Sequence, residues 1–313
     1  MSETSLETRG FYEKSPAARE LLETVGKSFL TGYAHAAEAR TPEAAEAPLE
    51  QVPIRFRGFA YEGAAMGFAV RDGLPLGGGG KFDRFLAGRA ADHVYMAYVG
   101  LGWGMARLPR FRWPDSAGTD PLLRWLALDG YGFHQAYFKT DKYVYEQYQD
   151  PRFPWPASDR PGDRAYANRA IDQGIGRALW FVGGTDADLV ATMIDKFPES
   201  RRPDLYSGAG LAATYAGGGD ENELTVFRQR AGDYRPQVAQ GSAFAAEARV
   251  RADLLVPHTH VATRVFCGMT PVQAAQVTHD TRPDLPVQGD LPAYEVWRQA
   301  IAEKFATRGG VRT

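Results

Sequence analysis

Cysteine is almost absent from this sequence, which has one, Cys267, among its 313 residues. A single thiol excludes any disulfide within the chain and any cysteine-rich zinc site. Proteins of reducing compartments typically lack disulfides, so we expect a cytoplasmic protein. Other metal ligands are also scarce, because His258 and His260, two positions apart, face the same way only on a strand. We therefore expect neither a metal ion nor a cofactor.

Long apolar runs and an excess of charge of one sign are also missing. The apolar run at residues 94–106 is well short of the ~20 residues that cross a membrane, so we expect a buried helix there. The formal charge of -2 attracts neither nucleic acid nor an anionic membrane at long range. The N-terminal residues lack the apolar core of a secretory signal. We expect no membrane span, no nucleic-acid partner and no export.

Known catalytic motifs are absent as well. The sequence contains no serine nucleophile elbow, no dinucleotide fingerprint and no metalloprotease helix. It also lacks the acid-rich motifs that bind magnesium in terpene cyclases. Any catalytic role must therefore rest on residues outside these familiar patterns.

The sequence does contain a repeat, in which two small residues stand two positions apart before an apolar or aromatic run. Seven copies align, although the last is weaker, and they lie 30 to 44 residues apart, which is the length of a helix pair. The first glycines of the copies are Gly32, Gly63, Gly100, Gly130, Gly174, Gly208 and Gly241.

One copy, residues 184–210, shows the signals of a helix, a turn and a second helix. Thr185 is a candidate N-cap, apolar residues follow at helical spacing, and Pro203 is placed to begin the second helix. Ser15 before Pro16 signals another helix start of the same kind. Each copy is therefore interpreted as a helical hairpin.

The repeat predicts an all-α fold in which such hairpins stack into a curved solenoid or a closed α/α array. Alternating strand patterns are nearly absent. We expect residues 1–14 to form an N-terminal tail and residues 15–310 a single domain of about seven GxG-containing helix pairs. Less regular segments are expected at residues 72–80, 108–120, 140–162 and 281–291.

The glycines of the repeat are most simply explained by close packing of neighbouring helices. A glycine in a helix interior costs about 1 kcal/mol relative to alanine, so a recurring pair needs a reason. Gly63 and Gly67, four positions apart, lie on one face of a helix. We interpret the glycines as a set as packing residues.

Acidic side chains near the small pairs suggest a site. Glu62 and Asp129 directly precede their glycines, and Asp172 stands one step earlier in its copy, before Gln173. Because acids are unfavourable in a dry contact and equivalent repeat positions align, these carboxylates are predicted to converge on one groove near Arg177. There, repulsion and desolvation would raise at least one carboxyl pKa. The alternative is that they begin helices and favour the helix dipole.

Two further features have both a functional and a packing interpretation. His134 lies four residues after Gly130 and near Asp129, which makes it a candidate general base or an ordinary core histidine. Arg177 and Trp180 are one turn apart, a pair that could bind an anion or stack a flat unsaturated ligand. The alternative for the pair is a solvated arginine over an indole.

Five segments taken together resemble one family. They read RGFAYEGAAMGFA, MARLPR, LDGYGFHQAYF, RAIDQGIGRALWF and DLYSGAGLAATYAGG, in this order. The chain resembles the DUF1702 family, the UnbL-like proteins associated with enediyne polyketide biosynthesis in actinobacteria, over roughly residues 25–305. The resemblance implies a role beside an iterative polyketide synthase that makes a linear conjugated polyene. It supplies no catalytic residues, so the site below rests on the residues themselves.

Two functions follow from these observations. In the first, the helical array binds a long apolar polyene and assists its cyclisation or maturation by proton transfer. The candidate catalytic residues are Glu62, Asp129, His134, Asp172 and Arg177. The candidate substrate-binding residues are Tyr61, Tyr98, Tyr131, Gln173, Trp180, Tyr206 and Tyr215. In the second, the array is a non-catalytic scaffold that holds partner enzymes of the pathway, so at this point enzymatic activity stays open.

Overall fold

Helices account for 74% of the chain, and no strand occurs among the residues that the computed structural model describes, 2–75, 78–156 and 161–309. The all-α prediction is therefore confirmed. The α-helices are α1 (Leu6–Arg9), α2 (Pro16–Glu38), α3 (Glu46–Glu50), α4 (Ile54–Gly73), α5 (Lys81–Ala87), α6 (Val94–Arg107), α7 (Trp125–Phe138), α8 (Pro161–Val182), α9 (Ala187–Asp195), α10 (Arg202–Ala216), α11 (Glu221–Arg230), α12 (Arg235–Arg251), α13 (Pro257–Cys267), α14 (Pro271–Asp280) and α15 (Ala293–Gly309).

Seven helices carry the small-residue pairs: α2, α4, α6, α7, α8, α10 and α12. Each packs against the next in this order, and α12 packs against α14. Short helices connect most of them, whereas α6, α7 and α8 are joined by less regular chain that includes a π-helical turn at Asp141–Tyr145. The hairpin description thus fits the C-terminal copies best. Residues 76–77, 157–160 and 310, which fall in the predicted irregular segments and at the predicted domain limit, lie outside the described residues.

The pair spacing of two gives each helix two contact faces. A Cβ atom added to Gly174 of α8 would lie 1.8 Å from the carbonyl oxygen of Asp129 on α7, the preceding helix. One added to Gly176 would lie 2.1 Å from the carbonyl oxygen of Leu205 on α10, the following helix. Residues two apart point about 200° away from each other around a helix. In α6, α7, α8 and α10, which have glycine at both positions, the first glycine therefore meets the previous copy and the second meets the next.

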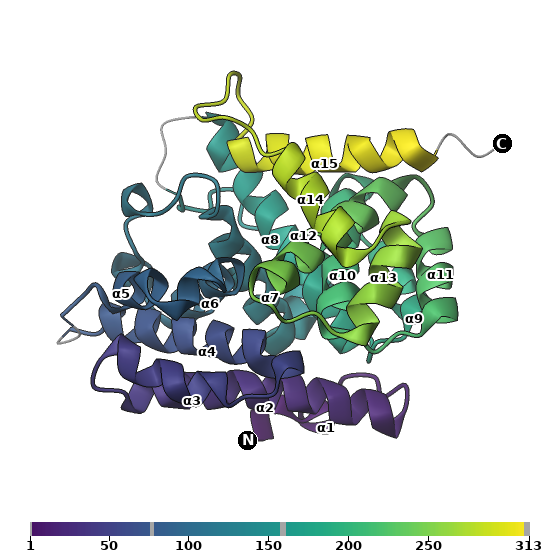
Figure 1. Ribbon diagram of the computed structural model, residues 1–313. Helices are drawn as coiled ribbons and strands as arrows, with labels where there is room; N and C mark the ends of the chain where they lie inside the picture. The colour runs from purple at the N-terminus through teal and green to yellow at the C-terminus, as the bar shows by residue number, and fades with distance from the viewer. Residues whose placement is uncertain (1, 76–77, 157–160, 310–313) are drawn as a thin grey trace.

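The series of helices curves back on itself. α12 contacts α6, and Arg249 near the end of α12 donates hydrogen bonds to the carbonyl oxygens of Arg55 on α4, at 3.1 Å, and Tyr215 on α10, at 2.6 Å. Figure 1 shows α2 and α15 at opposite edges of the molecule, with the other pair-bearing helices between them. None of the helices in the described part of the chain combines the length and apolarity needed to cross a membrane.

Side-chain caps define several helix starts. Ser15 accepts a hydrogen bond from the backbone amide of Ala18 at 3.2 Å, as its position before a proline predicts. Thr185, predicted to cap α9, is not the cap. Asp186 takes that role by accepting from the amide of Leu189 at 2.9 Å, while Thr185 adopts a left-handed backbone with φ of 65°.

The first residues pack against the rest of the molecule. Leu6 and Phe11 are buried in the core. The backbone amide of Tyr12 donates to the carbonyl oxygen of Val182 at 3.0 Å, and Lys14 forms an ion pair with Glu223 at 2.7 Å. The boundary predicted between tail and domain at residue 15 stays a prediction.

Candidate functional site

Three helices bring Glu62 of α4, Asp129 of α7 and Arg177 of α8 together at the centre of the array. The Nη1 atom of Arg177 donates to Oδ1 of Asp129, and its Nη2 atom lies 3.8 Å from Oε1 of Glu62. All three side chains are buried. We call these residues the central trio. Each stands beside a small-pair glycine, so the close approach of the helices also brings the charges together.

The central trio has two acids for one base, and burial shifts their pKa values. Burial raises the pKa of Glu62 to about 7; Arg177 opposes this shift, and Asp129 adds to it. Burial also raises the pKa of Asp129, against the effect of Arg177. For Arg177, burial lowers the pKa, but the two carboxylates outweigh it and the pKa rises. Near neutral pH, Glu62 therefore exists in both protonation states.

Several buried polar atoms near the central trio lack a hydrogen-bond partner among the described residues. They include Oδ2 of Asp129 and the hydroxyl of Tyr215. Buried polar groups are normally paired, and an unpaired one costs about 1–3 kcal/mol. The polar groups around the trio are therefore incompletely paired.

Two cavities meet at the central trio. The smaller is about 50 Å³ and the larger about 330 Å³. Arg177, Phe59 and Phe181 line both, whereas Asp129 lines only the smaller one and Glu62 only the larger one. The charged groups thus lie at the boundary of two spaces.

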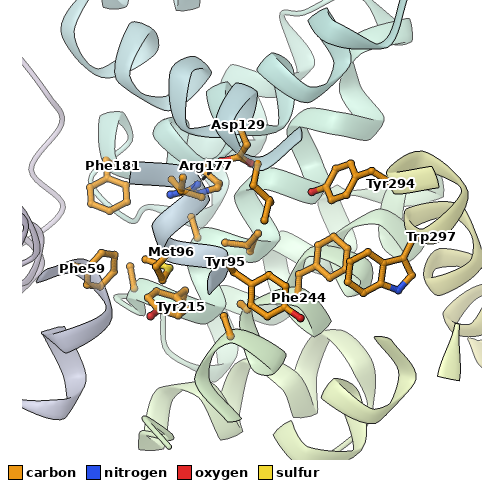
Figure 2. Close-up of a pocket in the computed structure, with 17 residues that line it drawn as sticks. Phe59, Tyr95, Met96, Asp129, Arg177, Phe181, Tyr215, Phe244, Tyr294 and Trp297 are labelled. Carbon is orange, nitrogen blue, oxygen red and sulfur yellow. Dashed lines mark hydrogen bonds and ion pairs between the residues drawn. The ribbon is translucent and has the colours of Figure 1, made fainter. Parts of the chain in front are cut away.

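The walls of both cavities are largely apolar and aromatic. Figure 2 shows the smaller cavity, with Arg177 beside Asp129, Phe59 and Phe181 at one end, and Phe244, Tyr294 and Trp297 at the other. The larger cavity lies between α2 and the helices α4, α6, α7 and α8. Its aromatic wall includes Phe29, Trp103, Phe133, Tyr137 and Phe138. Such a lining suits a hydrophobic, unsaturated molecule.

The cavity-lining residues follow a simple register relative to the first residue of each small pair. In six helices, the residue that stands three positions after the first residue of the pair lines a central cavity: Met66, Trp103, Phe133, Arg177, Leu211 and Phe244. The residue seven positions after it lines a central cavity as well: Val70, Arg107, Tyr137, Phe181, Tyr215 and Ala248. The two contact faces divide the circumference of a helix into a wider and a narrower arc. At 100° per residue, both positions fall in the narrower arc, and we call this side of the helix the inner face. This register was the signal in the sequence that could have found Trp103 and Phe181, which the prediction missed. Phe59, also missed, stands four positions before Gly63 on the same face of α4.

The same register explains where Asp172 lies. It stands two positions before Gly174, which turns it to the outer side of α8, whereas Glu62 and Asp129 stand one position before their glycines. Arg201 binds both of its carboxylate oxygens, at 2.9 and 2.5 Å. The structure therefore does not bring Asp129 and Asp172 into one groove.

Gln173 is the residue of α8 that corresponds to Glu62 and Asp129. Its Oε1 atom accepts a hydrogen bond from the hydroxyl of Tyr294, a residue of the smaller cavity, at 3.2 Å.

Besides its contacts with Arg201, Asp172 accepts a hydrogen bond from Nε2 of Gln149 at 3.0 Å. Burial raises the pKa of Asp172, and Arg201 opposes that shift.

His134 is buried next to the larger cavity but does not line it. Its ring packs against Trp103, with centroids 5.3 Å apart, and against Phe138, at 4.7 Å. Burial lowers its pKa to about 3, so the imidazole is neutral. The role of general base predicted for it stays a prediction.

Of the aromatic residues predicted to bind substrate, Tyr215 lines a central cavity. The others, which line neither central cavity, are Tyr61, Tyr98, Tyr131, Trp180 and Tyr206. Several of them stand two positions before a small pair and so face outward, where their hydroxyls find other partners. Tyr61, for example, donates to Glu50 at 2.6 Å, and Tyr206 donates to Asp195 at 3.1 Å.

The predicted pairing of Arg177 with Trp180 is replaced by another aromatic contact. The guanidinium of Arg177 lies 5.1 Å from the ring centroid of Phe133 on the neighbouring helix. The indole of Trp180 instead donates to the carbonyl oxygen of Gly217 at 2.9 Å. Phe181, four residues after Arg177, shares its face and lines both cavities.

Comparison with known proteins identifies a family and no characterised relative. In the described part of the chain, no group of three or more histidine, cysteine, aspartate or glutamate side chains is arranged to hold a metal ion. No curated protein and no solved structure matches the chain. The family model described as "Protein of unknown function (DUF1702)" matches residues 1–305. The chain belongs to the DUF1702 family.

Proposed function

We propose that this protein binds a long hydrophobic polyene inside the helical array and catalyses its redox-neutral rearrangement or cyclisation by proton transfer. The observation that carries the proposal is the position of Glu62, whose pKa is raised to about 7 by burial, at the boundary of two apolar cavities. A helical scaffold needs no such group in its interior.

The ligand class follows from the walls. Aromatic side chains on the inner face offer flat apolar surfaces, and Arg177 with its two carboxylates is the ionic group that the two cavities share. A conjugated polyene matches these walls in shape and polarity. The resemblance to UnbL-like proteins, associated with enediyne polyketide biosynthesis, names the same class of molecule.

In the proposed reaction, protonated Glu62 donates its proton to one carbon of the conjugated system. The positive charge that forms is stabilised by the faces of neighbouring rings such as Trp103 and Phe59. Loss of a proton from another carbon to Glu62 restores the acid, so double bonds shift or a ring closes without any change in composition. Arg177 stabilises the carboxylate form of Glu62, and Asp129 holds Arg177 in place.

Binding is tested with diphenylhexatriene, a neutral conjugated molecule that fluoresces in apolar surroundings. The wild-type protein should bind it saturably. Val70→Phe places a ring in the larger cavity and should weaken binding, whereas Val272→Phe, at an exposed position on α14, should not. Equal binding by both variants would contradict the proposed ligand site.

Catalysis is tested in the producing organism by replacing Glu62 with Gln, with exposed Glu303→Gln as the matched control. The first variant should abolish the pathway product while leaving the protein folded, and the control should not. Native mass spectrometry of the wild-type protein from the same cells should show a bound polyene. A bound partner protein with an empty interior, together with full activity of the Glu62 variant, would instead support the scaffold function.

A further inference from the structure

A third cavity, of about 210 Å³, lies on the outer side of α7 and α8. α7 contributes Tyr131, Gln135 and Lys139 to it, and the chain between α7 and α8 contributes Lys142 and Tyr143. None of its described lining residues lines either central cavity. It is therefore a separate site, and its function is independent of the polyene proposal.

The rim of this outer cavity carries more positive than negative charge. Arg110 is paired with Asp150 at 2.9 Å. Lys139 and Lys142 form no ion pair with a described carboxylate. The Nζ atom of Lys142 instead lies 3.9 Å from the ring centroid of Tyr148. The cations of the cavity thus outnumber its carboxylate by two.

The floor of the outer cavity is polar and buried. Nε2 of Gln135 donates to the hydroxyl oxygens of Tyr131 at 2.8 Å and Tyr143 at 3.3 Å. The hydroxyls of Tyr131 and Tyr143 also lie within hydrogen-bond reach of each other, so at least one of the two phenol hydrogens stays available to a ligand. Oε1 of Gln135 is buried beside His134 and is not exposed to the cavity. The floor therefore offers a hydroxyl donor.

We infer that the outer cavity binds a phosphate group. A dianion balances the two unpaired ammonium groups of Lys139 and Lys142, and its oxygens accept from them and from a phenol hydroxyl. A carboxylate has only half of this charge. The combination of groups therefore favours a dianion such as phosphate, and sulfate, which has the same shape and charge, is the comparison in the test.

The inference is tested by isothermal titration calorimetry with inorganic phosphate and sulfate. The wild-type protein should bind one phosphate per chain, and sulfate should compete for the same site. Replacing Lys139 and Lys142 together with Gln should weaken phosphate binding at least about tenfold, because two charge-assisted hydrogen bonds are lost. Lys304→Gln, an exposed lysine on α15, is the matched control and should bind as the wild type does.

Sedimentation with vesicles containing phosphatidic acid identifies the source of the group: lysine-dependent binding places it on a lipid, and phosphate binding without vesicle binding places it on a soluble molecule. No phosphate binding, or equal affinity in the double-lysine variant and its control, overturns the inference.

Discussion

This fold contains two buried ionic clusters that differ in their charge balance. One is the central trio, and we call the other the α15 network. In the α15 network, Arg298 donates to Asp204 at 2.7 Å and to Glu295 at 3.1 Å. Arg169 donates to the same two carboxylates, at 2.9 and 2.8 Å. Two bases therefore meet two acids, and the network joins α8, α10 and α15.

The central trio lacks this balance. Arg177 alone faces Glu62 and Asp129, the contact with Glu62 is long at 3.8 Å, and Oδ2 of Asp129 has no hydrogen-bond partner among the described residues. No residue of the α15 network lines a central cavity, whereas all of the central trio do. A satisfied network rigidifies a fold, whereas an unbalanced one beside open space keeps a proton available.

The largest expected difference comes from removing one acid in each cluster. Asp204→Asn leaves buried Arg298 with less compensating charge and should lower the free energy of unfolding by about 3–5 kcal/mol in urea. Asp129→Asn should cost less than half of that, because Glu62 ionises more readily without Asp129 and takes over the pairing with Arg177. If the Asp129 variant is the less stable of the two, the central trio is structural and the comparison fails.

A smaller loss is expected when the contact that holds the central trio together is widened. Gly174→Ala places a methyl group 1.8 Å from the carbonyl oxygen of Asp129, so α7 and α8 must separate. Overpacking of this kind costs about 1–3 kcal/mol, measured by urea unfolding. Gly118→Ala meets no atom within 4 Å and is the control. Equal stability of the two variants would show that the close approach is not needed.

The stability of the wild-type protein should also depend on pH through Glu62. Its folded pKa of about 7 lies above the ordinary value of 4.5, so the folded state holds this proton more tightly than the unfolded state. This contribution is complete below pH 4.5 and is lost as the pH rises to about 7. Glu62→Gln should therefore gain on the order of 2 kcal/mol relative to wild type between pH 5 and pH 8. Parallel stability curves, measured with Glu303→Gln as reference, would refute the raised pKa.

The smallest effects are expected from one substitution made near each cluster. Tyr166→Phe removes a hydroxyl that accepts from Arg298 at 2.9 Å and should cost about 1 kcal/mol. Tyr215→Phe removes a buried hydroxyl without a hydrogen-bond partner in the described part of the chain and should leave stability unchanged or slightly increased. Thermal unfolding of both variants measures the difference, and a reversed order would mean that the hydroxyl of Tyr215 is paired after all.

The fold was predictable because its main signal is local. The small pairs recur at helix-pair spacing and mark the helix contacts directly. The meeting of Glu62, Asp129 and Arg177 was also within reach, because all three stand beside such glycines. Their catalytic roles remain predictions.

Other parts of the site were not predicted, for two physical reasons. A shift of one residue turns a side chain by about 100°, which sends Asp172 to Arg201 and away from the cavities. The α15 network depends on contacts between distant helices, such as that between Asp204 and Arg298, and no spacing within one repeat copy announces them.

The two glycine contacts of α6, α7, α8 and α10 also have a consequence for the curvature of the array. Because they are about 200° apart on one side and 160° on the other, each helix acts as a wedge of about 20°. A row of such wedges bends toward the narrower side, which is the side of the inner face. The interior is therefore the hollow of a bent row, and its width depends on how many helices complete the bend. Adding or deleting one repeat copy would change the size of molecule that the interior admits, without altering any single helix.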